Sequence, residues 1–229
     1  MERSNDMKDA ILKVGDGRGF VVALHHHVNG EERVIITAAH CLPKVPPPHP
    51  ARYLQECTYG RLLGPLGGKR TVWAECLFAD VMADIAVLGP PDNQELSREA
   101  DAYDQLVGAV TPLPVADAPV QGSELKTLGE HQVAIPTPGE GQAQVLSLKG
   151  RWLKGHVSRR DGWLDFAPAK YFVGGMSGSP IIDATGAAIG VVSCSNSSQT
   201  TANPVIVDSL SARLARAIKI ASRAAQRGK

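Results

Sequence analysis

Residues 18–41 read RGFVVALHHHVNGEERVIITAAHC, and this stretch gives the first indication of the fold. The apolar run RGFVVAL leads to Asn29-Gly30, a dipeptide typical of two-residue hairpin turns, and ERVIITAA supplies a returning strand. A β-hairpin is therefore predicted over residues 18–39, and His40 and Cys41 lie directly at its end.

Similar short β-type runs recur through the chain. They lie at residues 70–78, 84–88, 123–129, 143–150, 162–167, 179–183 and 187–193. Residues 89–111 are polar and turn-rich, with room for one helical stretch, and are interpreted as the connection between two halves. The 23 glycines, 16 prolines and 5% aromatic residues suit many short strands better than a helical bundle. Two successive β units are the simplest description.

The last segment has a different pattern. Asp208 or Ser209 can cap a helix, in which Leu210, Leu214, Ile218 and Ala221 repeat at helical spacing. The arginines lie mainly off this stripe. A docked helix with a solvated basic face is therefore predicted, with nucleic-acid binding as the minor alternative.

The bulk properties exclude several classes of protein. The chain has 229 residues, 43% hydrophobic and 21% charged, and a net charge of +1, which gives no general attraction to nucleic acid or to an anionic membrane. The start, MERSNDMKDA, is too charged for a signal peptide, and no later run reaches the roughly 18 apolar residues of a membrane span. The chain is expected to be cytoplasmic, or else a mature form whose signal has been removed.

The cysteines and histidines do not predict a metal site. Cys41, Cys57, Cys76 and Cys194 form no C-x-x-C pair, so structural zinc is disfavoured and free thiols are preferred to disulfides. The run His25-His26-His27 lies on a predicted strand, where successive side chains point to opposite faces and do not readily converge on one ion.

Three short segments carry candidate chemistry: TAAHC (37–41), ADIAVL (83–88) and GGMSGSP (174–180). Each has a structural explanation, since His40 could be a core histidine, Asp84 a cap and Ser177 part of a tight turn. Their order argues for catalysis. The interval from His40 to Asp84 is 44 residues, and that from Asp84 to Ser177 is 93.

This combination resembles the chymotrypsin/trypsin-type serine peptidases, whose His, Asp and Ser follow in the same order at intervals of about 45 and 93 residues. Within that family it is most similar to the bacterial branch of glutamyl endopeptidases and HtrA-like protease domains, and the resemblance covers nearly the whole chain. Subtilisin-like and α/β-hydrolase orders differ, and GMSGS lacks the second elbow glycine. The resemblance implies an all-β fold of two six-stranded antiparallel β-barrels: residues 1–100, then 101–207, followed by the helix at 208–229.

The resemblance also implies the roles of the residues. Ser177 is the nucleophile, His40 its general base, and Asp84 the group that orients the imidazole. Gly175 and Ser177 match the backbone donors of the oxyanion hole. Asp80 competes with Asp84, but the apolar strand after Asp84 favours the latter, and Asp80 is expected to serve the turn. The substrate is a protein or peptide, and no cofactor, nucleic acid or membrane is predicted.

The pattern departs from the digestive enzymes at two positions. Met176 stands where trypsin-like zymogens have an aspartate, and no Ile-Val-Gly-Gly type start is present, so activation by N-terminal cleavage is not expected. Cys41 has no upstream cysteine to form the family's usual bridge. A PDZ domain of the HtrA kind is not expected after the terminal helix.

By resemblance, the specificity pocket is formed by the residues before Gly174, the strand end near Ser193 and the segment after Pro204. The positions are Tyr171, Phe172, Val173, Ser193, Cys194, Ser195 and Val205. None is acidic, so cleavage after Arg or Lys is not expected, and no basic residue suits a glutamate side chain. A small or medium apolar residue at the cleavage site is predicted. Alternatively, Tyr171 and Phe172 are partly core residues.

Two alternatives to an active peptidase stay open: a catalytically silent module that binds peptides or partners, and a protease activated by a regulatory protein partner. The proline-rich stretch 42–52 is interpreted as a surface loop, with a docking ligand for a partner as the alternative.

Overall fold

The computed structural model describes residues 7–26, 30–46, 57–81, 83–116, 125–128, 131–134, 141–160, 163–168, 172–196 and 199–204. The predicted helix at 208–229 and most of the proline-rich stretch, from residue 47, lie outside these ranges. So do His27, Tyr171 and Val205, and the side chains of His25, His26, Cys194 and Ser195 are not described either.

The first half of the chain forms a closed six-stranded antiparallel barrel. Its strands are β1 (Ile11–Val14), β2 (Gly17–His26), β3 (Gly30–Thr37), β4 (Thr58–Pro65), β5 (Val72–Asp80) and β6 (Ile85–Gly89). They follow the order β1-β2-β3-β6-β5-β4, and pairing of β1 with β4 closes the barrel. Every residue of β6 is buried, as the predicted strand DIAVL requires.

The two strands of the predicted hairpin are confirmed, but Gly30 lies in a strand and not in a turn. Phe20 pairs with Ile36 and Val22 with Val34, and this register buries all four side chains. The same register pairs His26 with Gly30. Gly30 is therefore a strand residue and not the second residue of a two-residue turn.

A second closed barrel follows. Its strands are β9 (Gly141–Leu146), β10 (Trp152–Arg160), β11 (Trp163–Ala167), β12 (Pro180–Asp183), β13 (Ala188–Asn196) and β14 (Gln199–Pro204). They run in the order β10-β11-β14-β13-β12-β9, and β9 pairs with both β10 and β12. Two shorter strands, β7 (Leu125–Leu128) and β8 (His131–Ala134), pair with each other in a separate sheet.

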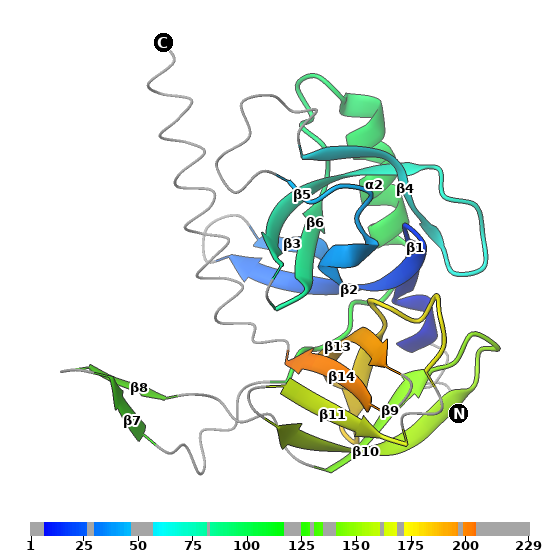
Figure 1. Ribbon diagram of the computed structural model, residues 1–229. Coiled ribbons are helices and arrows are strands. Elements are labelled where there is room, and N and C mark those ends of the chain that lie inside the picture. The colour runs from blue at the N-terminus through cyan, green and yellow to red at the C-terminus, as the bar shows by residue number, and fades with distance from the viewer. Residues whose placement is uncertain are drawn as a thin grey trace.

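One helix, α2 (Ser97–Gly108), lies in the segment expected to connect the halves, and it packs on β5 of the first barrel (Figure 1). Its Tyr103 is fully buried, with its hydroxyl 2.9 Å from the Leu88 carbonyl and 3.2 Å from the Arg33 carbonyl. Together, the two closed barrels confirm the predicted fold of two six-stranded antiparallel barrels. Among the described residues, no helix is long and apolar enough to span a membrane.

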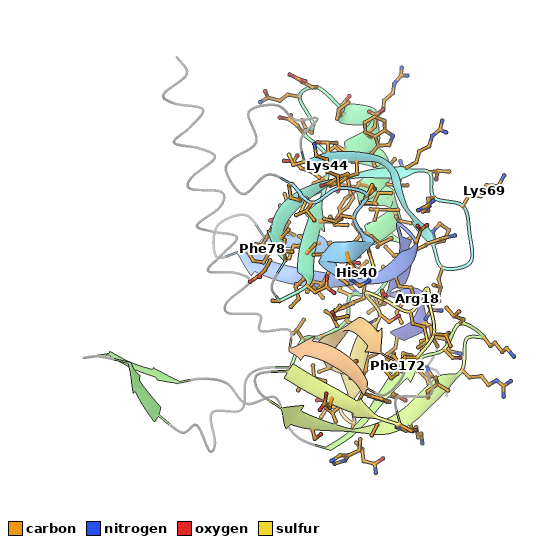
Figure 2. The ribbon with its side chains drawn as sticks, in the orientation of Figure 1. Arg18, His40, Lys44, Lys69, Phe78 and Phe172 are labelled. Carbon is orange, nitrogen blue, oxygen red and sulfur yellow. The ribbon has the colours of Figure 1, made fainter. Side chains whose placement is uncertain are left out.

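The barrels lie one above the other, and His40 and Arg18 are found where they meet (Figure 2). His40 follows β3 in a short 3-10 turn, η1 (Ala39–Cys41), at the edge of the first barrel. The loop that contains Ser177 connects β11 to β12 in the second barrel. The Arg18 N–H donates to the Ser177 carbonyl at 2.7 Å, so the two barrels bond directly beside the candidate nucleophile.

Candidate active site

His40 is bound to Asp84 by both its ring and its backbone. Its Nδ1 lies 2.7 Å from Asp84 Oδ2, and its backbone N–H donates to Oδ1 at 3.0 Å. The N–H of Ala39 also donates to the Asp84 carbonyl, at 3.2 Å. An ionised carboxylate can only accept, so Nδ1 carries the proton and Nε2 is left to act as an acceptor.

Asp84 has an unusual backbone and a second side-chain partner. It lies just before β6 with φ of +49°, in the left-handed region that aspartate and asparagine enter more readily than most residues. The Ser193 hydroxyl donates to its Oδ2 at 2.5 Å. Asp80 instead accepts the Ala83 N–H at 2.9 Å, within the turn between β5 and β6. The carboxylate at His40 is therefore that of Asp84.

The pKa shifts of the pair follow from these bonds. The hydrogen bond that the His40 ring donates to Asp84 raises the pKa of His40; burial opposes this to a smaller extent, and the carboxylate charge adds to the increase. Burial alone would raise the pKa of Asp84, but hydrogen bonds from the His40 ring, Ser193 and the His40 backbone outweigh it and lower that pKa. The pair therefore consists of a stabilised carboxylate and an imidazole of increased basicity.

Two overlapping turns form the loop around Ser177. The Met176 N–H donates to the Val173 carbonyl at 3.2 Å, and the Ser179 N–H donates to the Met176 carbonyl at 3.0 Å. The third residues of these turns, Gly175 and Gly178, have φ of +89° and +79°, as in type II turns. Glycine is needed at both because a side chain is strained at such φ. Met176, shared by the turns, is 1% exposed and packs in the core of the second barrel.

The Ser177 hydroxyl lies 3.5 Å from the Ser193 carbonyl. Among the described residues this is its hydrogen-bonding neighbour, and no hydrogen bond joins it to His40. Ser193 thus contacts both parts of the site, the carboxylate through its hydroxyl and the serine through its carbonyl.

The residues predicted to form the specificity pocket differ in their exposure and contacts. Val173 is 52% exposed beside the nucleophile loop. Phe172 is buried and packs edge-to-face on Phe166, with the ring centroids 5.1 Å apart, so its interpretation as a core residue is confirmed. Ser193 is only 6% exposed, and its hydroxyl contacts Asp84.

None of the described cysteines Cys41, Cys57 and Cys76 forms a disulfide. Burial raises the pKa of Cys41 to about 11. Its Sγ lies against Gly17, where an added Cβ would be 2.5 Å away, so Gly17 faces the sulfur that the family usually bridges.

Two interactions of this region were not predicted from the sequence. Ser193 was predicted as a residue of the specificity pocket, but its contact with Asp84, 109 residues away in the sequence, was not predicted. Arg18 is 4% exposed, and its only signal is a charged residue between Gly17 and Gly19 at the start of an apolar strand.

A carboxylate-bound histidine on one six-stranded barrel, facing a glycine-rich serine loop on a second, defines the chymotrypsin-like class of double-barrel proteins. The family model described as trypsin-like peptidase domain matches residues 17–191, which is most of the chain. The chain belongs to this family of peptidases. No curated protein matches the sequence.

Proposed function

We propose that the protein is a serine endopeptidase in which His40, Asp84 and Ser177 form the catalytic triad. The observation that carries this proposal is the 2.7 Å contact of His40 Nδ1 with Asp84, since it leaves Nε2 as a base on the side of the site away from the carboxylate. In the reaction, Nε2 takes the Ser177 proton as Oγ bonds to the substrate carbonyl carbon. The protonated His40 then gives that proton to the leaving amine, and water releases the acyl group by the same route.

The oxyanion formed in this step needs backbone donors, and we assign Gly175 and Ser177. Neither of these two N–H groups donates to another group in the part of the chain that the structure describes. Free donors beside a serine on a tightly turned loop suit a site for developing negative charge, and one such donor contributes about 10²–10³ in turnover.

N-terminal activation is not part of this proposal. Met176 has no charge for a new ammonium group to neutralise, and its side chain is anchored in an apolar core. The loop is closed instead by its own turns and by two bonds to β13, from Gly178 N–H to the Val192 carbonyl at 2.7 Å and from Val192 N–H to the Ser179 carbonyl at 2.9 Å. The chain should therefore be active without removal of N-terminal residues.

For specificity, we propose a small or medium apolar residue on the acyl side of the cleaved bond. Val173, an exposed apolar side chain beside the loop, supports this preference. Tyr171, Ser195 and Val205 remain assigned to the pocket by resemblance. We also place the protein in the bacterial, HtrA-like branch and in the cytoplasm, with protein or peptide substrates.

One observation favours a second candidate, a peptidase that a partner protein activates. The Ser177 hydroxyl is directed to the Ser193 carbonyl at 3.5 Å and not to His40. A partner that rotates this side chain or shifts the loop would complete the triad.

A fluorophosphonate probe separates these functions. Wild type, S177A and H40A are incubated with the probe at equal concentrations of folded protein, and the labelled residue is mapped by mass spectrometry. Labelling of Ser177 in wild type alone supports the proposal, whereas labelling that requires an added partner supports the second candidate. Absence of labelling under every condition indicates a silent module. A peptide library, assayed with the reactive form, then tests the predicted apolar preference.

A further inference from the structure

Arg18 crosses from one barrel to the other. It lies at the start of β2 and is 4% exposed. Its Nη1 donates to the Leu146 carbonyl at 2.6 Å, and its Nη2 donates to the Ser147 carbonyl at 3.1 Å. Both acceptors are at the end of β9 in the second barrel.

Burying the Arg18 guanidinium in this way lowers the stability of the fold, so a functional reason for it is expected. No carboxylate among the described residues pairs with Arg18, and burial lowers the pKa of its guanidinium. A buried cation loses its hydration, and neutral carbonyls replace only part of that loss. Apolar side chains of similar volume often stabilise such positions as well as charged groups do, so stability alone does not account for an arginine here.

The main chain of Arg18 contacts both catalytic segments. Its N–H donates to the Ser177 carbonyl at 2.7 Å, and its carbonyl accepts from the Thr37 hydroxyl at 2.6 Å. Thr37 is fully buried at the end of the strand that leads to His40. An added Cβ at Gly178 would lie 1.8 Å from the Arg18 carbonyl, so the nucleophile loop packs directly on this residue.

The side chain of Arg18 holds the hairpin 147–151, which connects β9 to β10. Within it the Ser147 N–H donates to the Arg151 carbonyl at 2.8 Å, and the Gly150 N–H donates to the Ser147 carbonyl at 3.1 Å. Leu148, at its tip, is 52% exposed, and its Cδ2 is 3.7 Å from the position of a Cβ on Gly175. The hairpin therefore borders the turn that contains Gly175.

We propose that Arg18 is a positioning residue of the active site. Its guanidinium fixes the hairpin 147–151 against the Gly175 turn, while its main chain fixes the Ser177 loop against the His40 segment. The guanidinium charge thus acts next to the Ser177 loop, while residue 176 within that loop is an uncharged methionine. This inference rests on the proposed serine peptidase function for its catalytic effect, but not for its structural effect.

The kinetic test compares R18M and R18K with R33M. Arg33 is a matched control, because its Nη1 also lies near main-chain carbonyls, those of Val107 and Val110 at 2.9 Å, at the end of α2 and away from the site. With active sites counted by fluorophosphonate titration, R18M is expected to lower kcat by about 10²-fold, within the range for losing an oxyanion donor, and to change KM by less than about 3-fold. R18K should recover part of kcat, and R33M should keep wild-type kcat at temperatures well below its Tm.

A structural arginine would give a different result. R18M would then lower Tm but leave kcat per titrated site unchanged, which would overturn the inference. If R18M does not fold, R18K decides. A lysine does not form the fork that reaches both carbonyls, so wild-type kcat in R18K would equally overturn it.

Hydrogen exchange tests the same inference without activity. Amide exchange is measured by mass spectrometry in S177A, with and without R18K or R18M, at segments containing Gly150 and Met176, whose N–H groups are hydrogen-bonded. Exchange is expected to be at least about 10-fold faster in both segments in the Arg18 variants and unchanged there in R33M. If the wild type proves unreactive, the proposed function fails, and exchange still decides on Arg18: unchanged protection would overturn the inference.

Discussion

Ser193 Oγ lies 2.5 Å from Asp84 Oδ2, the oxygen that also faces His40 Nδ1. Two donors thus converge on one carboxylate oxygen, while the other, Oδ1, accepts the His40 backbone N–H. Both oxygens of the carboxylate accept hydrogen bonds. Rotation of the Asp84 side chain away from His40 would therefore break at least one charge-assisted hydrogen bond.

Replacement of Ser193 by alanine should therefore impair catalysis. A hydrogen bond to a charged group contributes about 1.5–3 kcal/mol, so kcat/KM of S193A is expected to fall by roughly 10-fold to 100-fold. Steady-state assays with the best library peptide measure this. S158A, on an exposed position of β10, is the control. Equal activity of S193A and wild type would show that Asp84 needs no such support.

Replacement of Asp84 by asparagine should have a larger effect. The amide can present its NH₂ group to His40 and favour the wrong tautomer, and loss of this carboxylate in serine peptidases costs about 10⁴ in kcat. Tm should change little, because asparagine tolerates the left-handed backbone at this position. D80N is the control, since its amide oxygen can still accept the Ala83 N–H. If D80N lowered kcat as much as D84N does, the assignment of Asp84 as the partner of His40 would be contradicted.

The activity should depend on pH through His40. The base must be neutral, and its hydrogen bond to Asp84 raises the pKa of His40 above the ordinary 6.5. Activity is therefore present above this raised pKa and lost as the pH falls through it. The acid limb of kcat/KM, with NMR titration of His40 in S177A, measures the value. An acid limb at or below pH 6.5 would argue against the His40–Asp84 pair as the base.

Gly178 should not tolerate a side chain. Its φ is +79°, and a Cβ would clash with the Arg18 carbonyl at 1.8 Å and the Thr37 hydroxyl at 2.6 Å. G178A is expected to lower the free energy of unfolding by more than about 2 kcal/mol. Denaturant melts compare it with G108A, where a Cβ meets no atom within 4 Å and little change is expected. Comparable stability of the two variants would contradict the close packing of the loop.

Cys41 should resist alkylation in the folded protein. It is 7% exposed, and burial raises its pKa to about 11, so little thiolate is present near pH 8. Iodoacetamide treatment followed by peptide mapping should leave Cys41 unmodified in the native state and modify it in denaturant. Rapid modification of Cys41 in the native protein would disagree with its burial against Gly17.

The sequence predicted those parts of the fold that local pattern controls. The segments RGFVVAL, ERVIITAA and DIAVL became β2, β3 and β6 because their apolar residues fill one barrel. β10 was missed because WLKGHVSRR mixes apolar and charged residues on a largely solvated strand. Gly30 lies in β3 and not in a turn because strand register, set by the buried pairs, places it opposite His26.

The candidate site was likewise predicted only in part from the sequence. Order and spacing brought out His40, Asp84 and Ser177, and the structure places His40 and Asp84 in contact. The contacts of Ser193 and Arg18 depend on tertiary packing between residues more than 100 positions apart, which no local pattern encodes.

The left-handed backbone of Asp84 also restricts how this protein can diverge. At φ of +49°, asparagine or glycine can replace aspartate with little strain, whereas most other side chains would add about 1–3 kcal/mol. A descendant that abandons catalysis but keeps this fold is therefore expected to carry Asn or Gly at position 84. In related sequences, Asn or Gly at this position, downstream of an intact T-A-A-H-C segment, would identify relatives that have lost activity.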